Sequence, residues 1–118
     1  MMEVNYSQKK GLISYVINGK ITADDMRQLQ EARDQLAENS TLKVLAIVIS
    51  FKGYKSFEGM KNALLGDWRM LPKLSKYAML TDSTWLRALI FILNPLVLKS
   101  ELKAFPLRDR KLADRWLE

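Results

Sequence analysis

The first twenty residues alternate between short apolar runs and polar turns. The runs Met2–Tyr6 and Leu12–Ile17 are rich in valine, isoleucine and tyrosine, which is typical of strands. Polar residues and Gly11 separate the two runs, and Asn18-Gly19 ends the second. This pattern predicts an N-terminal β-hairpin.

A helical period follows the hairpin. Thr22 is suited to cap the first turn, and Asp25, three residues later, can complete a capping box. Apolar residues then recur at helical spacing, at Met26, Leu29, Ala32 and Leu36. We predict an amphipathic helix of about 17 residues that ends near Glu38-Asn39.

Two buried strands and one helix are predicted in the middle of the chain. Lys43–Ser50 contains six consecutive apolar residues, and a run without alternation is typical of a parallel strand buried on both faces. Tyr77–Leu80 is a shorter run of the same kind. Between them, Ser56 can cap a helix over residues 57–71, which Pro72 would end.

The last third predicts a helix, a strand and a helix. Asp82-Ser83 would cap a helix over Trp85–Leu93, which Pro95 ends. Glu101–Phe105 alternates like a half-exposed edge strand, and a final helix runs from about Asp109 to Leu117. The order β-β-α-β-α-β-α-β-α predicts one α/β domain over residues 1–118, with a single-layer, mixed, mostly parallel sheet.

The composition excludes several kinds of chemistry. The 118 residues include no cysteine and no histidine, so zinc fingers, disulfide frameworks, Cys nucleophiles and His general bases are absent. Asp24 and Asp25 are adjacent, but neighbouring helical side chains point about 100° apart and do not face each other. We therefore predict that the protein is not an enzyme and holds no metal or cofactor.

The apolar runs are short. Met1–Lys10 contains no apolar segment of a secretory signal, and no apolar run in the chain, Ala88–Leu93 included, exceeds six residues. A membrane-spanning helix needs about 20. We expect a cytoplasmic location.

The positive charge lies in the C-terminal half. Residues 60–118 contain 11 basic and 6 acidic side chains, which account for +5 of the total charge of +6. Nucleic-acid binding would need aromatic side chains available for stacking beside these charges. Because Trp68, Trp85 and Trp116 lie on apolar helical stripes, we expect them in the core and expect no nucleic-acid partner.

The predicted helix Trp85–Leu93 is unusual because Arg87 is its only polar residue, and a surface helix should show a polar face. It could be buried in the monomer, or form the interface with a second copy or another protein. It could instead line a groove for an apolar ligand, or lie on a membrane with Arg87, Lys99 and Lys103 facing anionic head groups. The candidate residues are Trp85, Leu86, Leu89, Ile90, Leu93, Leu96 and Leu98.

An ordered set of short motifs resembles a known family. The segments are Gly19–Asp25, Thr81–Trp85, Asn94-Pro95, Glu101–Leu107 and Ala113–Leu117. Together they resemble the SpoIIAA-like bacterial family, a branch of the STAS (sulfate transporter and anti-sigma-factor antagonist) superfamily, over about residues 15–117. The resemblance implies a βα-superhelix fold, which CRAL-TRIO lipid-binding domains share, and small cytoplasmic proteins mostly without assigned function.

Better-known relatives act in partner switching, in which a serine at a helix N-terminus is phosphorylated. Those relatives carry an Asp-Ser-Ser-Gly-like turn, whereas Phe51–Gly59 offers Ser56 without the flanking aspartate. Lys52 and Lys55 lie near Ser56 in sequence, and a phosphate at a helix N-terminus would meet free amides. Ser56 is therefore a candidate phosphorylation or anion site, although a simple helix cap is the preferred interpretation.

Two functions follow as hypotheses. The first is a non-catalytic STAS-like interaction or regulatory module, homodimeric through the apolar helix, which a flat patch of Leu86, Ile90 and Leu93 would favour. The second is a carrier or sensor of an apolar ligand or membrane lipid, as the CRAL-TRIO relationship suggests. An elongated cavity beneath the apolar helix would favour the second, lined by Met60, Leu64, Trp85 and Leu89.

Overall fold

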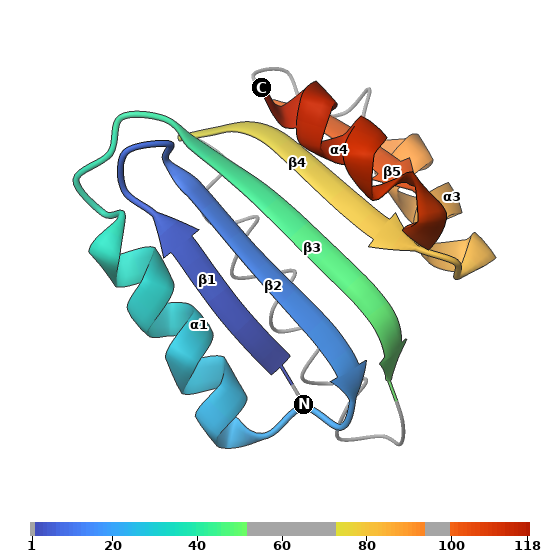
Figure 1. Cartoon of the computed structure of the whole chain (residues 1–118), viewed down its shortest axis with the longest axis horizontal. Helices are drawn as coiled ribbons and strands as arrows, with labels where there is room; N and C mark the ends of the chain where they lie inside the picture. The colour runs from blue at the N-terminus through green and yellow to red at the C-terminus, as the bar shows by residue number, and fades with distance from the viewer. Residues whose placement is uncertain (1, 52–72, 94–99) are drawn as a thin grey trace.

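A five-stranded mixed sheet forms the centre of the structure, a computed structural model in which residues 2–51, 73–93 and 100–118 are described (Figure 1). The strands lie in sequence order: β1 (Met2–Ser7), β2 (Leu12–Gly19), β3 (Leu42–Phe51), β4 (Leu74–Thr81) and β5 (Glu101–Phe105). β1 runs antiparallel to β2, and every later pair is parallel. The predicted mixed sheet behind a hairpin is confirmed, while the helix predicted over residues 57–71 lies outside the described residues.

Helices cover both faces of this sheet. α1 (Ala23–Gln35) and α3 (Thr84–Leu93) pack on one face, and the short helix η2 (Leu107–Asp109) leads into α4 (Arg110–Leu117) on the other face (Figure 1). β3 supplies side chains to both cores, because Val44 and Ala46 lie in the first and Leu45 lies in the second. The prediction that this strand is buried on both faces is therefore confirmed.

Asp24 and Asp25 both form hydrogen bonds at the start of α1. The Asp25 amide donates to the Thr22 hydroxyl at 3.1 Å, and the Thr22 amide donates to the Asp25 carboxylate at 2.9 Å, as the predicted capping box requires. The Arg27 guanidinium donates hydrogen bonds to Asp24 and holds the pKa of that carboxyl below its usual value. The two acids thus bond within their own helix rather than face a common site.

α1 ends earlier than the sequence predicts, and α3 begins directly after Ser83. α1 ends at Gln35, before Glu38, because the Leu36 amide donates to the Arg33 carbonyl three residues back, which tightens the last turn. At α3, the Ser83 carbonyl accepts from the Arg87 amide at 3.2 Å. The Asp82 carboxylate accepts from the Leu107 amide at 3.0 Å and so connects the end of β4 to the segment that follows β5.

Gly11 connects the hairpin to the start of β3. Its φ is +60°, and its carbonyl accepts from the Lys43 amide at 2.7 Å. A Cβ atom at this position would lie 2.8 Å from the Thr41 carbonyl oxygen. Gly19 also has a positive φ, +81°, but a Cβ there would meet nothing within 4 Å.

The two glycines make a matched pair for a stability test. We expect Gly19→Ala to lower the free energy of unfolding by about 1–2 kcal/mol. The left-handed backbone at this position is unfavourable for alanine, but the added Cβ atom would meet no neighbour. Gly11→Ala should cost clearly more, because its Cβ also meets a backbone oxygen that cannot move independently. Urea unfolding of both variants measures the difference, and equal losses would contradict the close approach at Gly11.

Candidate functional site

Helix α3 has one buried side and one exposed side. Leu86 is 0% exposed and Ile90 is 1% exposed, whereas Phe91 is 82% exposed and Ile92 is 62% exposed. Leu89 is half-buried between the two sides. Because Leu86 and Ile90 are four residues apart, they lie on the same face of the helix and point together into the core.

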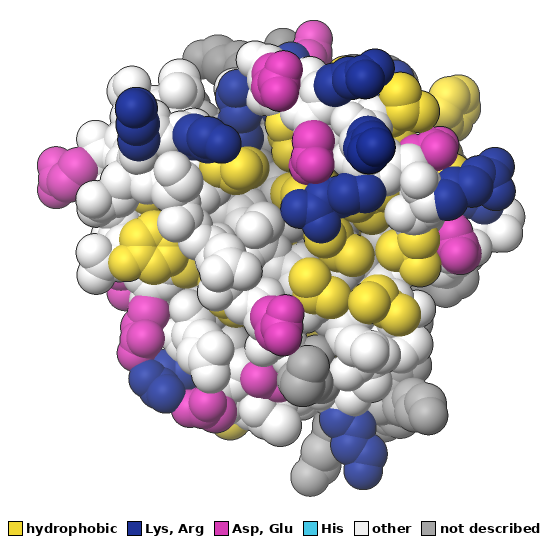
Figure 2. Space-filling model, in the orientation of Figure 1, with side chains coloured by type: hydrophobic (Ala, Val, Ile, Leu, Met, Phe, Trp, Pro, Cys, Tyr) yellow, Lys and Arg dark blue, Asp and Glu magenta, His cyan; other side chains and the backbone are white. Residues whose placement is uncertain are grey.

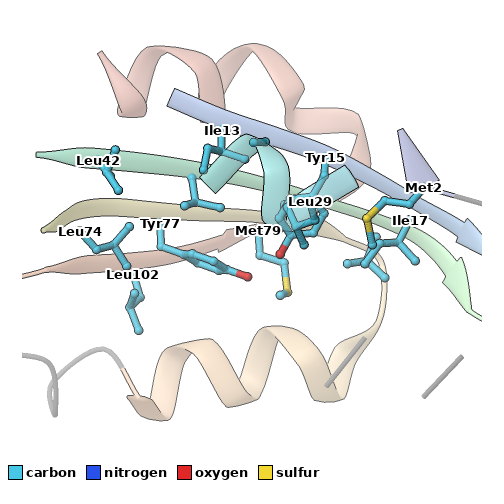
Figure 3. Packing of buried hydrophobic residues seen from close by; sticks show 14 of the residues in the cluster. Met2, Ile13, Tyr15, Ile17, Leu29, Leu42, Leu74, Tyr77, Met79 and Leu102 are labelled. Atoms are coloured by element: carbon cyan, nitrogen blue, oxygen red, sulfur yellow. The ribbon is translucent and has the colours of Figure 1, made fainter. Parts of the chain in front are cut away.

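The buried side decides between the alternatives for two of the candidate residues. Leu86 and Ile90 were candidates for a contact patch, with burial in the monomer as an alternative, and both belong to the core cluster with Tyr77, Met79 and Leu102 of the sheet. Figure 3 shows the labelled Tyr77, Met79 and Leu102 pointing from the strands towards α3. A flat patch containing Leu86 and Ile90 is therefore absent from the described surface, because packing against the sheet already covers both side chains.

Other candidates fall outside the part of the chain that the structure describes. Leu96, Leu98 and Ser56 lie in undescribed segments. The side chains of Trp85 and Leu93 are likewise not described, although both residues belong to α3. The interface or ligand role of Leu96, Leu98, Trp85 and Leu93, and the phosphorylation or anion role of Ser56, remain predictions.

Phe91 and Ile92 carry the exposed side of α3, and the sequence analysis did not single them out. An almost wholly apolar helix gives no polar face by which to tell inside from outside. Arg87 could have indicated the exposed side, because it is the one charged residue of the helix and a charged side chain should face water. Phe91 lies four residues after Arg87, one turn further along the same side.

A groove runs along β5, between α3 and α4. β5 forms one edge of the sheet, with α3 and Leu102 on one face and α4 and Phe105 on the other. The groove has a volume of about 500 Å³ and is open to solvent. We call it the β5 groove; it is lined by Arg87, Ile90, Phe91, Glu101, Leu102, Lys103, Ala104 and Trp116.

Aromatic contacts hold the α4 wall of the β5 groove in place. The Trp116 ring meets the Phe105 ring edge-on, with centroids 6.1 Å apart. The Lys76 ammonium lies 5.3 Å from the Trp116 ring centroid and donates to the Trp116 carbonyl at 2.6 Å. Lys103 of β5 places its ammonium 5.3 Å from the Phe105 ring centroid. Trp116 packs partly against the second core, as its place on an apolar stripe predicts.

Basic side chains gather over α4, and two more lie in the groove itself. α4 and the turn before it carry Arg108, Arg110, Lys111 and Arg115, and Figure 2 shows Lys and Arg side chains gathered over α4. Arg110 donates to Asp114 at 3.1 Å within the same helix. Among the groove-lining residues, Arg87 and Lys103 are basic and Glu101 is acidic. The groove therefore combines apolar walls with charged side chains of both signs.

The acidic residues considered for chemistry have structural contacts. Asp24 and Asp25 bond within the first turn of α1, and Asp82 accepts from the Leu107 amide. Among the described residues, no group of three or more acidic side chains is placed to hold a metal ion. Likewise, no helix within the described ranges is long and apolar enough to cross a membrane.

The topology defines an α/β protein with a hairpin-led, mostly parallel sheet covered by helices on both faces. The sequence model of the SpoIIAA-like family matches residues 12–118, and the chain belongs to that family. A solved structure with the same fold is an uncharacterised protein of the DUF3478 family, with a SpoIIAA-like fold, from Shewanella loihica PV-4. It matches with a TM-score of 0.67 and 17% identity over 100% of this chain and 93% of that chain. A comparison with curated proteins finds no match.

The two sides of α3 can be tested by neighbouring substitutions. Ile90→Ala should lower the free energy of unfolding by about 2–5 kcal/mol, because it leaves a cavity in the core. Phe91→Ala should change it by about 0.5 kcal/mol or less, because the ring is largely in water. Chemical denaturation of dilute protein measures both values, and a larger loss for Phe91→Ala would show that the helix is rotated.

Proposed function

We propose that the protein is a non-catalytic interaction module of the SpoIIAA-like family that forms a homodimer through the exposed side of α3 and the β5 groove. The observation that carries this proposal is the exposure of Phe91, a large aromatic side chain that is 82% accessible next to the 62% accessible Ile92. Adjacent exposed apolar side chains are characteristic of contact sites, since their burial by a partner removes apolar surface from water.

Composition and contacts favour binding over catalysis. The chain has no cysteine or histidine, the side chains that most often act as nucleophile or general base. The acids at Asp24, Asp25 and Asp82 serve helix and loop contacts. A regulatory module needs only a shaped surface, and the β5 groove beside Phe91 is such a surface.

The dimer is tested by light scattering coupled to size exclusion over a range of concentrations. We expect the wild-type chain to run as a dimer and Phe91→Asp to shift it towards monomer. Removing a central aromatic contact commonly costs at least about 2 kcal/mol, or roughly 30-fold in the dissociation constant. Ile90→Asp is a poorer probe, because a buried carboxylate would unfold the core.

Tyr6→Asp is the matched control. Tyr6 is an exposed aromatic residue on β1, at the opposite edge of the sheet, so its loss should leave the dimer intact. A wild-type protein that is monomeric at every concentration would overturn the proposed self-association, as would a dimer that Tyr6→Asp disrupts and Phe91→Asp does not.

A second candidate function is binding to an anionic membrane surface. It is favoured by the basic Arg87 and Lys103 beside the exposed Phe91, since basic and apolar side chains together bind lipid interfaces. Here we expect sedimentation with phosphatidylserine-containing vesicles and not with pure phosphatidylcholine, and at least a tenfold loss of binding in Phe91→Asp. Equal binding of wild type and Phe91→Asp would rule out this surface as the lipid contact.

A further inference from the structure

We infer that a pocket on the α4 face of the sheet binds a small organic anion, a molecule with one carboxylate or sulfonate group on an apolar body. The pocket has a volume of about 630 Å³, and small-molecule sites range over roughly 300–1,000 Å³. We call it the α4 pocket; its lining comes from β2, β3, α4 and the hairpin turn. None of its lining residues, all in the described part of the chain, belongs to α3 or β5, so ligand binding there is independent of the proposed dimer.

Four side chains of β2 and β3 form the floor of the α4 pocket. In the parallel register of these strands, Leu12 is aligned with Lys43, and Ser14 is aligned with Leu45. Side chains alternate along a strand, and the residues between these four belong to the core on the α3 face, so all four point to the α4 face. The floor therefore places an ammonium group and a hydroxyl beside two leucine side chains.

One side of α4 forms a wall of the pocket. Arg110, Asp114 and Leu117 follow one another at i, i+4 and i+7, which puts them on the same side of the helix, and all three line the pocket. Leu117 is buried in the same core cluster as Leu45, so the apolar part of the floor continues into the wall. Arg110 donates to Asp114 at 3.1 Å, so the charged part of the wall is an ion pair.

Basic side chains outnumber acidic ones in the α4 pocket. The basic residues are Lys10, Lys43 and Arg110, and the acidic ones are Asp114 and Glu118. The Lys43 ammonium donates to the Glu118 backbone carbonyl at 3.4 Å, which leaves it further N–H groups for a ligand. The Lys10 ammonium has no hydrogen-bond or ion-pair partner within the described part of the chain. Figure 2 shows Lys and Arg side chains on this face at the hairpin end of the strands as well as over α4.

Backbone contacts keep the polar groups of the pocket close together. The Gly11 carbonyl accepts from the Lys43 amide at 2.7 Å, which joins the hairpin turn that carries Lys10 to the start of β3. Ser14 lies two positions further along β2 than Leu12, and its hydroxyl has no hydrogen-bond partner among the residues that the structure describes. A bound anionic group would accept from this hydroxyl and from the two ammonium groups, and charge-assisted hydrogen bonds are roughly twice as strong as neutral ones.

The lining selects the class of ligand. An inorganic anion would leave Leu12, Leu45 and Leu117 without an apolar partner, and a neutral apolar molecule would leave the free ammonium group of Lys10 unpaired. A molecule that joins an anionic group to an apolar body satisfies both parts of the lining. Such sites commonly combine apolar walls with a few polar groups that fix the orientation of the ligand.

Anilinonaphthalene sulfonate is a suitable probe, because it joins one sulfonate to aromatic rings. Phenylnaphthylamine has the same rings without the sulfonate. At low salt we expect saturable fluorescence enhancement with the sulfonate and at least about tenfold weaker binding of the neutral amine. Amide chemical-shift changes on addition of the sulfonate should concentrate in β2, β3 and the last turn of α4.

Charge variants test the sign of the ligand. Lys10→Gln and Lys43→Gln should each weaken binding of the sulfonate by at least about fivefold. Lys9→Gln is the matched control: it removes the same charge from the same turn at a residue outside the lining, so its effect should stay below about twofold. Asp114→Asn should tighten binding, because it removes a negative charge and releases Arg110 from its ion pair.

Several results would overturn the anion site. They are the absence of saturable binding, equal affinity for the neutral amine, an equal effect of Lys9→Gln and Lys10→Gln, and weaker binding in Asp114→Asn. Loss of the fluorescence signal in Phe91→Asp without loss in Lys10→Gln would place the probe on α3 and likewise overturn it. The dimer is decided separately by light scattering, so a monomeric wild type that binds the sulfonate with the expected charge dependence would leave the α4 pocket standing.

Discussion

Burial of the central strands on both faces is the constraint on which this structure depends. β3 and β4 contribute side chains to a core on each side of the sheet, so water must be excluded from both faces at once. α1 and α3 cover one face and α4 covers the other, and each helix directs an apolar side towards the sheet. Leu86 and Ile90 are buried for this reason, and they account for one side of a helix that is apolar on nearly all sides.

The candidate surface follows from the same constraint. α3 packs against the sheet through the side that carries Leu86 and Ile90, whereas Phe91 and Ile92 are exposed. Among the described strands, β5 is the last in the sheet, with α3 on one of its faces and α4 on the other, so the β5 groove lies between two helices. The exposed Phe91 side chain and the β5 groove are thus neighbours, because Phe91 lines that groove. Their proximity supports the contact surface proposed above.

Local patterns were sufficient where a single element carries its own signal. The capping box at Thr22 and Asp25 could be predicted because its donors and acceptors are three residues apart. The edge character of Glu101–Phe105 was visible in its alternation, and the two-sided burial of β3 was visible in its unbroken apolar run. The role of Asp82 could not be predicted, because its hydrogen-bond partner, the Leu107 amide, is distant in sequence and comes close only after β5 joins the sheet.

The order of amino acids was enough to establish the α/β class, the hairpin, the mostly parallel sheet and the absence of cysteine and histidine chemistry, because these depend on short-range periodicity and on composition. It also showed that the helix over residues 85–93 is apolar on nearly all sides, with Arg87 as its only polar residue. Which side of that helix meets water, and that it borders a groove along β5, depends on contacts between distant segments. A nearly uniform apolar helix has no polar side to orient it, so packing against Tyr77, Met79 and Leu102 sets its rotation. That rotation leaves Phe91 exposed and defines the surface proposed for self-association.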